Sequence, residues 1–170
     1  MKGYALSALG GLAALAAAPG AAQTITSRYT LLDLHRCRTL EIIPEGESVR
    51  WRCPGLAGIP LFVNEGDGRS EIDAGYDDGE WESVPAFNTI GDRIEWRLSA
   101  GRPYAIIYRL RKAATADAPA ESALIVEAIG YRGVPGCRIG LIDGASPDAN
   151  RRARALADRQ APNPHCARAP

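Results

Sequence analysis

Few side chains in this sequence are spaced for catalysis or for holding a metal ion. His35 and His165 lie near cysteines, but neither pairing has zinc-finger spacing and there is no Cys-x-x-Cys motif. A Cys–His nucleophile needs a free thiol. The sequence also lacks a Gly-x-Ser-x-Gly elbow and the spacing of a phosphate-binding loop. We therefore predict no catalytic residues, no cofactor and no metal, which favours a binding protein over an enzyme.

The most unusual run of side chains is acidic and extends from residue 65 to residue 82. Carboxylates with Gly-rich turns can bind calcium, but the order of an EF-hand loop is not met. A pair of solvated hairpin loops is the simpler interpretation. The alternative is a hydrolase that uses two of these carboxylates as an acid/base pair. The acidic residues are Glu65, Asp67, Glu71, Asp73, Asp77, Asp78, Glu80 and Glu82, and only Arg69 opposes them.

A second group consists of arginines on the polar sides of predicted strands. If these strands are neighbours, the arginines form one basic face, and guanidinium forks bind carboxylate, sulfate or phosphate in a two-pronged way. The alternative is an ordinary polar sheet face with cross-strand partners such as Glu95 and Glu127. The arginines are Arg50, Arg52, Arg93, Arg97, Arg109 and Arg111.

The three tryptophans divide into two classes. Trp51 and Trp96 lie on apolar strand faces and are expected in the core, whereas Trp81 lies between two glutamates. An exposed aromatic side chain can anchor a partner or stack on a sugar. The candidate recognition surface therefore comprises Trp81, Asp77, Asp78, Glu80, Arg50, Arg52 and Arg97.

The N-terminal segment predicts export. One lysine, Lys2, precedes an apolar run from Tyr4 to Ala18, and small residues follow up to Ala22. This order is typical of a secretory signal peptide, here residues 1–22, with cleavage after Ala22. A membrane anchor is the alternative, but a spanning helix needs about 20 apolar residues. We predict a periplasmic or secreted protein with no membrane span after cleavage.

The cysteines fit that compartment. Four cysteines in an exported chain indicate disulfides, although the sequence alone does not decide among the three pairings. We favour Cys37 with Cys53, because a pair of strands could bring them together, which leaves Cys137 with Cys166.

The charge balance argues against nucleic acid as a partner. The chain has 20 basic and 20 acidic residues, and removal of Lys2 with the signal leaves the remainder with a net charge of −1. A nucleic-acid-binding protein is usually strongly basic.

The elements that must position these side chains are mostly strands. Apolar residues alternate in several runs, with the clearest at 49–53, 94–98, 104–110, 124–128 and 137–141, and weaker ones at 29–34, 59–64 and 69–74. Ser99-Ala100-Gly101 joins two of these runs at hairpin length. Residues 23–170 therefore form a single domain, an antiparallel β sandwich or barrel of about seven to eight strands.

One C-terminal helix is expected near residues 147–160. Ser146 is a suitable N-cap and Pro147 suits the first helical position. Ala149, Ala153, Leu156 and Ala157 recur at helical spacing and form a narrow apolar stripe, while arginines occupy the other faces.

Several short segments carry a resemblance to known sequences, namely 51–55, 58–60, 65–67, 87–88, 94–97 and 147–150. Together they resemble a group of small exported proteins of Gram-negative bacteria that have no assigned function. The resemblance covers most of the chain after the signal and implies export and a single domain, but no activity and no site residues.

These observations favour a non-enzymatic binding or interaction module of the periplasm: an inhibitor, an assembly factor or an accessory factor. Its expected partner is an envelope protein or an anionic envelope polymer. The rival hypothesis is an envelope-acting hydrolase that uses acidic residues of the 65–82 stretch.

Overall fold

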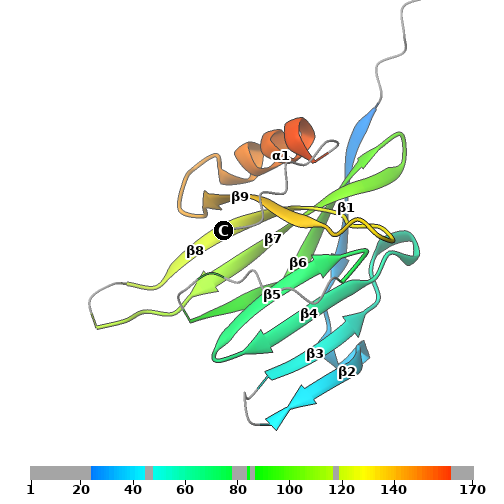
Figure 1. The fold of residues 1–170 in the computed structure, drawn as a ribbon. Coiled ribbons are helices and arrows are strands. Elements are labelled where there is room, and N and C mark those ends of the chain that lie inside the picture. Colours follow the sequence, from blue (N-terminus) through cyan, green and yellow to red (C-terminus); the bar gives the residue numbers. More distant parts are fainter. Residues whose placement is uncertain (1–23, 45–47, 78–83, 85–86, 117–118, 162–170) are drawn as a thin grey trace, which may run out of the picture.

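The computed structural model describes residues 24–44, 48–77, 84, 87–116 and 119–161. These residues form two antiparallel sheets and one C-terminal helix, which confirms the predicted mostly β, sandwich-like class (Figure 1). They include nine strands, compared with the seven or eight expected. The predicted signal peptide, residues 1–22, lies outside the described residues.

The larger sheet has five strands in the order β1-β6-β7-β8-β9. Its central hairpin, β6 with β7, turns at Ala100 and Gly101, and both residues have positive φ. Two such residues form the turn that matches the twist of paired strands, as the sequence predicted. The bounds are β1 Ile25–Leu31, β6 Asn88–Ser99, β7 Arg102–Lys112, β8 Glu121–Ala128 and β9 Cys137–Asp143.

The smaller sheet has four strands in the order β2-β3-β4-β5, with bounds β2 Arg38–Ile43, β3 Ser48–Cys53, β4 Leu61–Gly66 and β5 Arg69–Ala74. Strand β2 was not predicted. Its pairing with β3 shifts register between Thr39 and Glu41, so a bulge interrupts the alternation by which a strand is read. Two short 3-10 turns, η1 Leu34–Arg36 and η3 Leu56–Gly58, precede β2 and β4.

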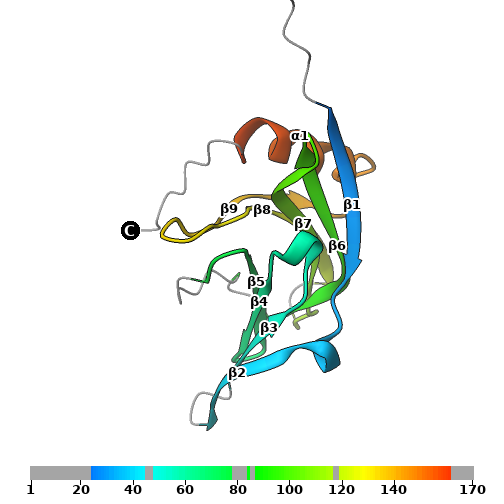
Figure 2. The same cartoon turned by 90° about the vertical axis from the view of Figure 1, so that its right-hand side faces the viewer.

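The main core lies between the two sheets. Trp96 and Tyr108 of the larger sheet are buried there against Leu61, Val63 and Ile72 of the smaller one. Trp96 is fully buried and its indole N–H donates to Thr30 Oγ1 at 2.8 Å, while Trp51 is partly buried against the same cluster. The core placement predicted for both tryptophans is thus confirmed. Strand β5 lies nearest the larger sheet, and the smaller sheet extends away from it toward β2 (Figure 2).

The open edge of β5 is closed by the larger sheet. Ala74 N–H donates to the buried Glu127 carboxylate at 3.3 Å, and Gly130 N–H donates to the Ala74 carbonyl at 2.8 Å. Gly75, which follows Ala74, has φ +86°, and a Cβ at this position would lie 2.1 Å from the Gly130 carbonyl oxygen. Only glycine allows this close approach of the two backbones.

Helix α1, Ala149–Gln160, packs on the other face of the larger sheet (Figure 1). Its buried residues are Ala149, Ala153 and Ala157, the stripe predicted from helical spacing, and Leu156 is partly buried against the same cluster. Because alanine is small, the helix lies close to the strands. No helix in the described part of the chain is long and apolar enough to cross a membrane.

The predicted helix start was two residues early. Residues before Ala149 form turns in which Asp143 accepts from Ala145 N–H at 2.9 Å through its carboxylate and from Ser146 N–H at 3.3 Å through its carbonyl. The helix N-cap is Asp148 rather than Ser146, and its side chain makes no capping hydrogen bond. The sequence predicted that the helix starts at Pro147. The hydrogen bonds to Asp143 instead favour a turn before residue 149.

Candidate functional site

A pocket of about 320 Å³ lies where the N-terminal half of α1 meets the larger sheet. Ile107 and Leu124, both buried, form apolar parts of its wall. Its polar lining brings together three arginines from three different elements. The other lining residues are Tyr29 from β1, Arg93 and Glu95 from β6, Tyr108 and Arg109 from β7, and Asn150 and Arg154 from α1.

Arg154 and Glu95 form one side of this pocket. Arg154 Nε and Nη2 donate to the two carboxylate oxygens of Glu95 at 2.6 and 3.2 Å, and Nη2 also donates to Tyr29 Oη at 3.0 Å. The hydrogen bond to Glu95 raises the pKa of Arg154 in spite of partial burial, so the guanidinium stays charged. The buried Glu95 carboxylate is thereby neutralised and held in place.

The other two arginines carry charge that no described carboxylate neutralises. Arg93 is exposed and lies over the ring of Tyr29, 4.4 Å from its centroid. Arg109 is half-buried and Nη1 donates to Ser122 Oγ at 2.8 Å. A Cβ at Gly144 would lie 2.5 Å from Arg109 Nη1, so this glycine makes room for the guanidinium. Apart from the Arg154–Glu95 pair, the pocket therefore carries two positive charges.

A hydrogen-bond network holds the C-terminal half of α1 on the same sheet face. Arg97 Nε and Nη2 donate to the two oxygens of Asp158 at 2.8 and 2.7 Å, and Tyr104 Oη donates to Asp158 at 2.6 Å. Arg97 Nη1 donates to Ser27 Oγ, which in turn donates to Glu95, each at 2.5 Å. The network therefore continues through Glu95 to the pocket.

The electrostatics of the network follow from these contacts. Burial alone would raise the pKa of Asp158, but the hydrogen bonds from Arg97 and Tyr104 lower it below its ordinary value. Burial and the hydrogen bond to Asp158 raise the pKa of Tyr104 to about 12. Asp158 is therefore held ionised and Tyr104 protonated.

The structure changes the interpretation of Arg97. Alternation placed it on an outward polar face, but only 8% of the residue is exposed, because α1 covers it. Its guanidinium binds Asp158 and Ser27, so its role is to hold the helix. Among the predicted arginines, Arg93 and Arg109 are the ones that line the pocket.

The remaining residues of the predicted recognition surface lie elsewhere. Arg50 and Arg52 belong to β3 of the smaller sheet, so the six arginines do not form one basic face. Arg50 donates to Asn64 at 3.1 Å, to Glu41 at 3.2 Å and to the largely buried Asp77. Arg52 is exposed, whereas Asp78, Glu80 and Trp81 lie outside the described residues.

The described part of the acidic stretch is a β hairpin rather than a pair of solvated loops. Glu71 on β5 is buried and accepts from Asn64 Nδ2 at 2.9 Å. Burial raises the pKa of Glu127 well above its ordinary range, and the neighbouring Asp73 and Glu71 raise it further. Glu71 thus bonds within the smaller sheet, and Glu71 and Asp73 lie close enough to Glu127 of the larger sheet to affect its pKa.

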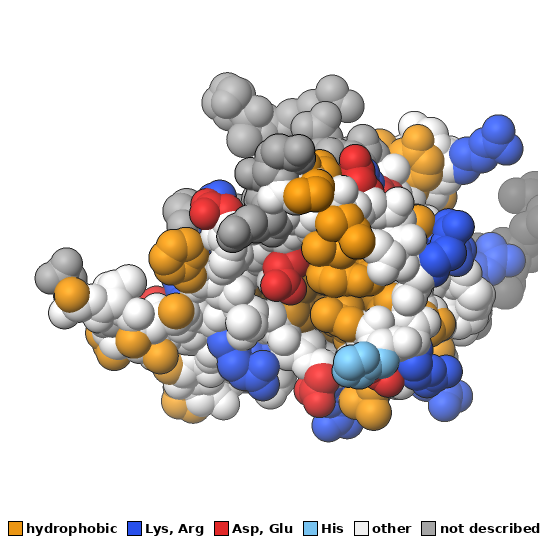
Figure 3. Space-filling view, turned by 90° about the horizontal axis from the view of Figure 1, so that it is seen from below, with side chains coloured by type: hydrophobic (Ala, Val, Ile, Leu, Met, Phe, Trp, Pro, Cys, Tyr) orange, Lys and Arg blue, Asp and Glu red, His pale blue; other side chains and the backbone are white. Residues whose placement is uncertain are grey.

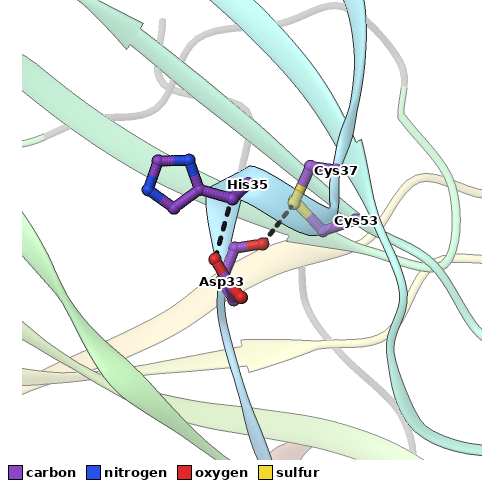
Figure 4. Close-up of a disulfide and its surroundings, with 4 residues drawn as sticks. All are labelled: Asp33, His35, Cys37 and Cys53. Carbon is purple, nitrogen blue, oxygen red and sulfur yellow. Dashed lines mark hydrogen bonds between the residues drawn. A yellow bond between two sulfur atoms is a disulfide. The ribbon is translucent and has the colours of Figure 1, made fainter.

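The disulfide predicted between Cys37 and Cys53 is present and ties the residue before β2 to the end of β3 (Figure 4). Nearby, Asp33 Oδ1 accepts from His35 N–H at 3.0 Å, and the carbonyl oxygen of Asp33 lies 3.2 Å from Cys37 Sγ. The latter is a polar contact, since a disulfide sulfur carries no hydrogen. Cys137 is also disulfide-bonded, and its predicted partner Cys166 lies outside the described residues.

No group of three or more His, Cys, Asp or Glu side chains within the described ranges is placed to hold a metal ion. Comparison with known proteins found no matching family model, no matching curated protein and no matching solved structure. The candidate site therefore rests on the geometry of the chain itself.

Sequence reasoning did not identify Tyr29, Asn150 and Arg154 as pocket residues. The signal for Arg154 was its place on a polar face of the predicted helix. Only the packing of that face on the sheet brings it to Glu95, and this contact joins residues 59 positions apart.

Proposed function

We propose that this chain is a non-enzymatic binding module of the bacterial envelope and that its pocket beneath α1 takes the carboxylate or phosphate group of an anionic envelope polymer. The observation that carries the proposal is the pairing of Arg93 and Arg109 in one pocket without a carboxylate partner among the described residues. The protein would serve as an accessory or assembly factor, or as an inhibitor that binds such a polymer.

The chemistry of the pocket supports an oxyanion. Guanidinium groups offer planar pairs of N–H donors that match carboxylate and phosphate. Asn150 from the first turn of α1 also lines the pocket, and its side-chain amide can donate to an oxyanion. A volume of about 320 Å³ suits one small unit of a polymer rather than a protein surface.

The compartment is part of the proposal. A protein stabilised by disulfides is suited to an oxidising space such as the periplasm. That space also contains polymers with carboxylate and phosphate groups.

The direct test is calorimetric titration of the disulfide-bonded protein with trigalacturonate in one arm and inorganic phosphate in the other, at low ionic strength. We expect binding that weakens as salt rises. Arg93→Gln and Arg109→Gln should each weaken it about tenfold or more, since a charged hydrogen bond contributes about 1.5–3 kcal/mol. Comparison of the arms decides between carboxylate and phosphate.

Two control variants make the result specific. Arg102 is exposed at the start of β7, away from the pocket, so Arg102→Gln should leave affinity unchanged. Arg52→Gln tests the outer face of the smaller sheet. If neither probe binds, the pocket is excluded as the anion site. It is excluded as well if Arg52→Gln lowers the affinity and Arg93→Gln does not. If the protein releases shorter sugars from trigalacturonate, and Glu71→Gln abolishes this activity, the rival hypothesis of an envelope-acting hydrolase would be favoured.

A further inference from the structure

A second cavity, of about 290 Å³, lies between the two sheets, on the opposite side of the larger sheet from α1. It opens where the chain leaves β1 and turns toward β2. Its apolar walls come from Leu32, Leu34, Val63 and Ile90, and three of these residues belong to or pack against the main core. Seen from below, hydrophobic side chains gather in the middle of this surface with acidic side chains beside them (Figure 3).

The splay of the sheets leaves this cavity open. Strand β5 contacts β6 and β8, but β2 and β3 extend away from the larger sheet (Figure 2). Leu34 at the rim is therefore 37% exposed, although Val63 at the floor is 2% exposed. An apolar floor that reaches solvent is a common feature of grooves that receive another chain.

The charge at the rim has the opposite sign from that of the pocket beneath α1. Glu65 from β4 and Asp92 from β6 line the cavity from the two sheets, and both are exposed. Within the described ranges neither carboxylate forms an ion pair. Arg69, which follows Glu65 in the next turn, binds Asp67 at 2.8 Å, and Arg93, the residue after Asp92, lies over the ring of Tyr29 in the pocket beneath α1. The rim thus presents two negative charges above an apolar floor.

We propose that this cleft binds an extended segment of a partner protein in which apolar side chains are flanked by lysine or arginine. The apolar side chains would cover Val63 and Ile90, and the cations would meet Glu65 and Asp92. This inference is independent of the anion pocket, since it uses another face and the opposite charge. With both surfaces occupied, the protein would join an anionic polymer to a cationic protein segment.

The experiment uses two fluorescein-labelled peptides, Gly-Lys-Leu-Val-Leu-Lys-Gly and a twin with glutamate in place of both lysines. Fluorescence anisotropy with the disulfide-bonded protein should show binding of the lysine peptide and at least tenfold weaker binding of the glutamate twin. The double variant Glu65→Gln/Asp92→Asn should bind the lysine peptide about tenfold more weakly. Leu34→Ser, at an exposed position, should weaken the binding of both peptides, because it removes apolar surface from the rim and adds no charge.

The matched control is Glu121→Gln/Asp143→Asn, which removes the same charge from exposed positions on β8 and β9. It should leave the affinity unchanged. The proposal is overturned if the two peptides bind equally well or if neither binds. It is also overturned if the control variant lowers the affinity as much as the Glu65→Gln/Asp92→Asn variant does. Thermal unfolding of every variant shows whether a loss of binding reflects a loss of fold.

Discussion

At the scale of residues, Arg93 and Arg97 show how one strand face serves two purposes. They lie four positions apart on β6 and point to the same side. Arg93 is exposed at the pocket, whereas Arg97 lies under α1 and holds Asp158 through two hydrogen bonds. The difference comes from the helix, which covers only part of the sheet face.

Arg97→Gln should destabilise the protein strongly. Its removal leaves the partly buried carboxylate of Asp158 without its charged partner, and breaking such a pair costs about 3 kcal/mol. Chemical denaturation would measure this loss. Arg102→Gln, an exposed substitution, should change the free energy of unfolding by less than about 0.5 kcal/mol.

Asp158 should also make the fold sensitive to acid. Its pKa is lowered in the folded state, so its contribution to stability is present above the unfolded-state pKa and is lost as pH falls through the folded-state value. Stability measured between about pH 6 and pH 2 should therefore fall, since an unperturbed aspartate has a pKa of about 3.9. Asp158→Asn should be less stable at pH 6 and should show a smaller fall. An identical slope in both proteins would contradict this assignment.

Residue patterns predicted part of the site. Alternation correctly put Arg93, Glu95, Arg97 and Arg109 on the polar sides of their strands. It could not show which arginine is buried, because burial of Arg97 depends on Tyr104 and Asp158, the latter 61 positions away. The pocket is formed by the contact of a helix with a sheet, and neither element shows it alone.

At the scale of elements, the disulfide and β2 belong together. Every residue of β2 is exposed, and the strand pairs only with β3 within the described part of the chain. The Cys37–Cys53 bond fixes the start of this weakly packed strand. Sequence reasoning predicted the bond but missed the strand, because the bulge near Leu40 disrupts the period-two pattern.

Cys37→Ser/Cys53→Ser should lower the free energy of unfolding by about 3 kcal/mol, because a loop of about 15 residues is no longer closed in the unfolded chain. Amide exchange in β2 should increase more than in β7, which lies inside the larger sheet. Equal exchange in the two strands would show that β2 does not depend on the bond.

At the scale of the whole molecule, Glu127 connects the two sheets. Its carboxylate is buried, accepts from Ala74 N–H on β5 and lies near Asp73 and Glu71. The hydrophobic pattern placed β8 correctly but predicted Glu127 as a cross-strand partner on a solvated face. The packing of the second sheet on that face buries it instead.

Glu127 should oppose stability at high pH. Because its pKa is raised in the folded state, its stabilising contribution is present below the unfolded-state pKa and is lost as pH rises through the folded-state value. Glu127→Gln keeps an oxygen that can accept from Ala74 but cannot ionise. The variant should therefore be more stable than the parent protein at pH 8 and similar to it at pH 4. Glu121→Gln, on the exposed end of the same strand, should show no such difference.

The network beneath α1 has a consequence for long-range thermodynamic coupling. Arg154 lines the pocket and binds Glu95, which connects through Ser27 and Arg97 to Asp158 near the end of the helix. An anion held by the pocket should therefore slow amide exchange along α1. Coupling between two sites is reciprocal, so Asp158→Asn should weaken anion binding although Asp158 does not line the pocket. The helix would then report occupancy of the pocket through its own stability.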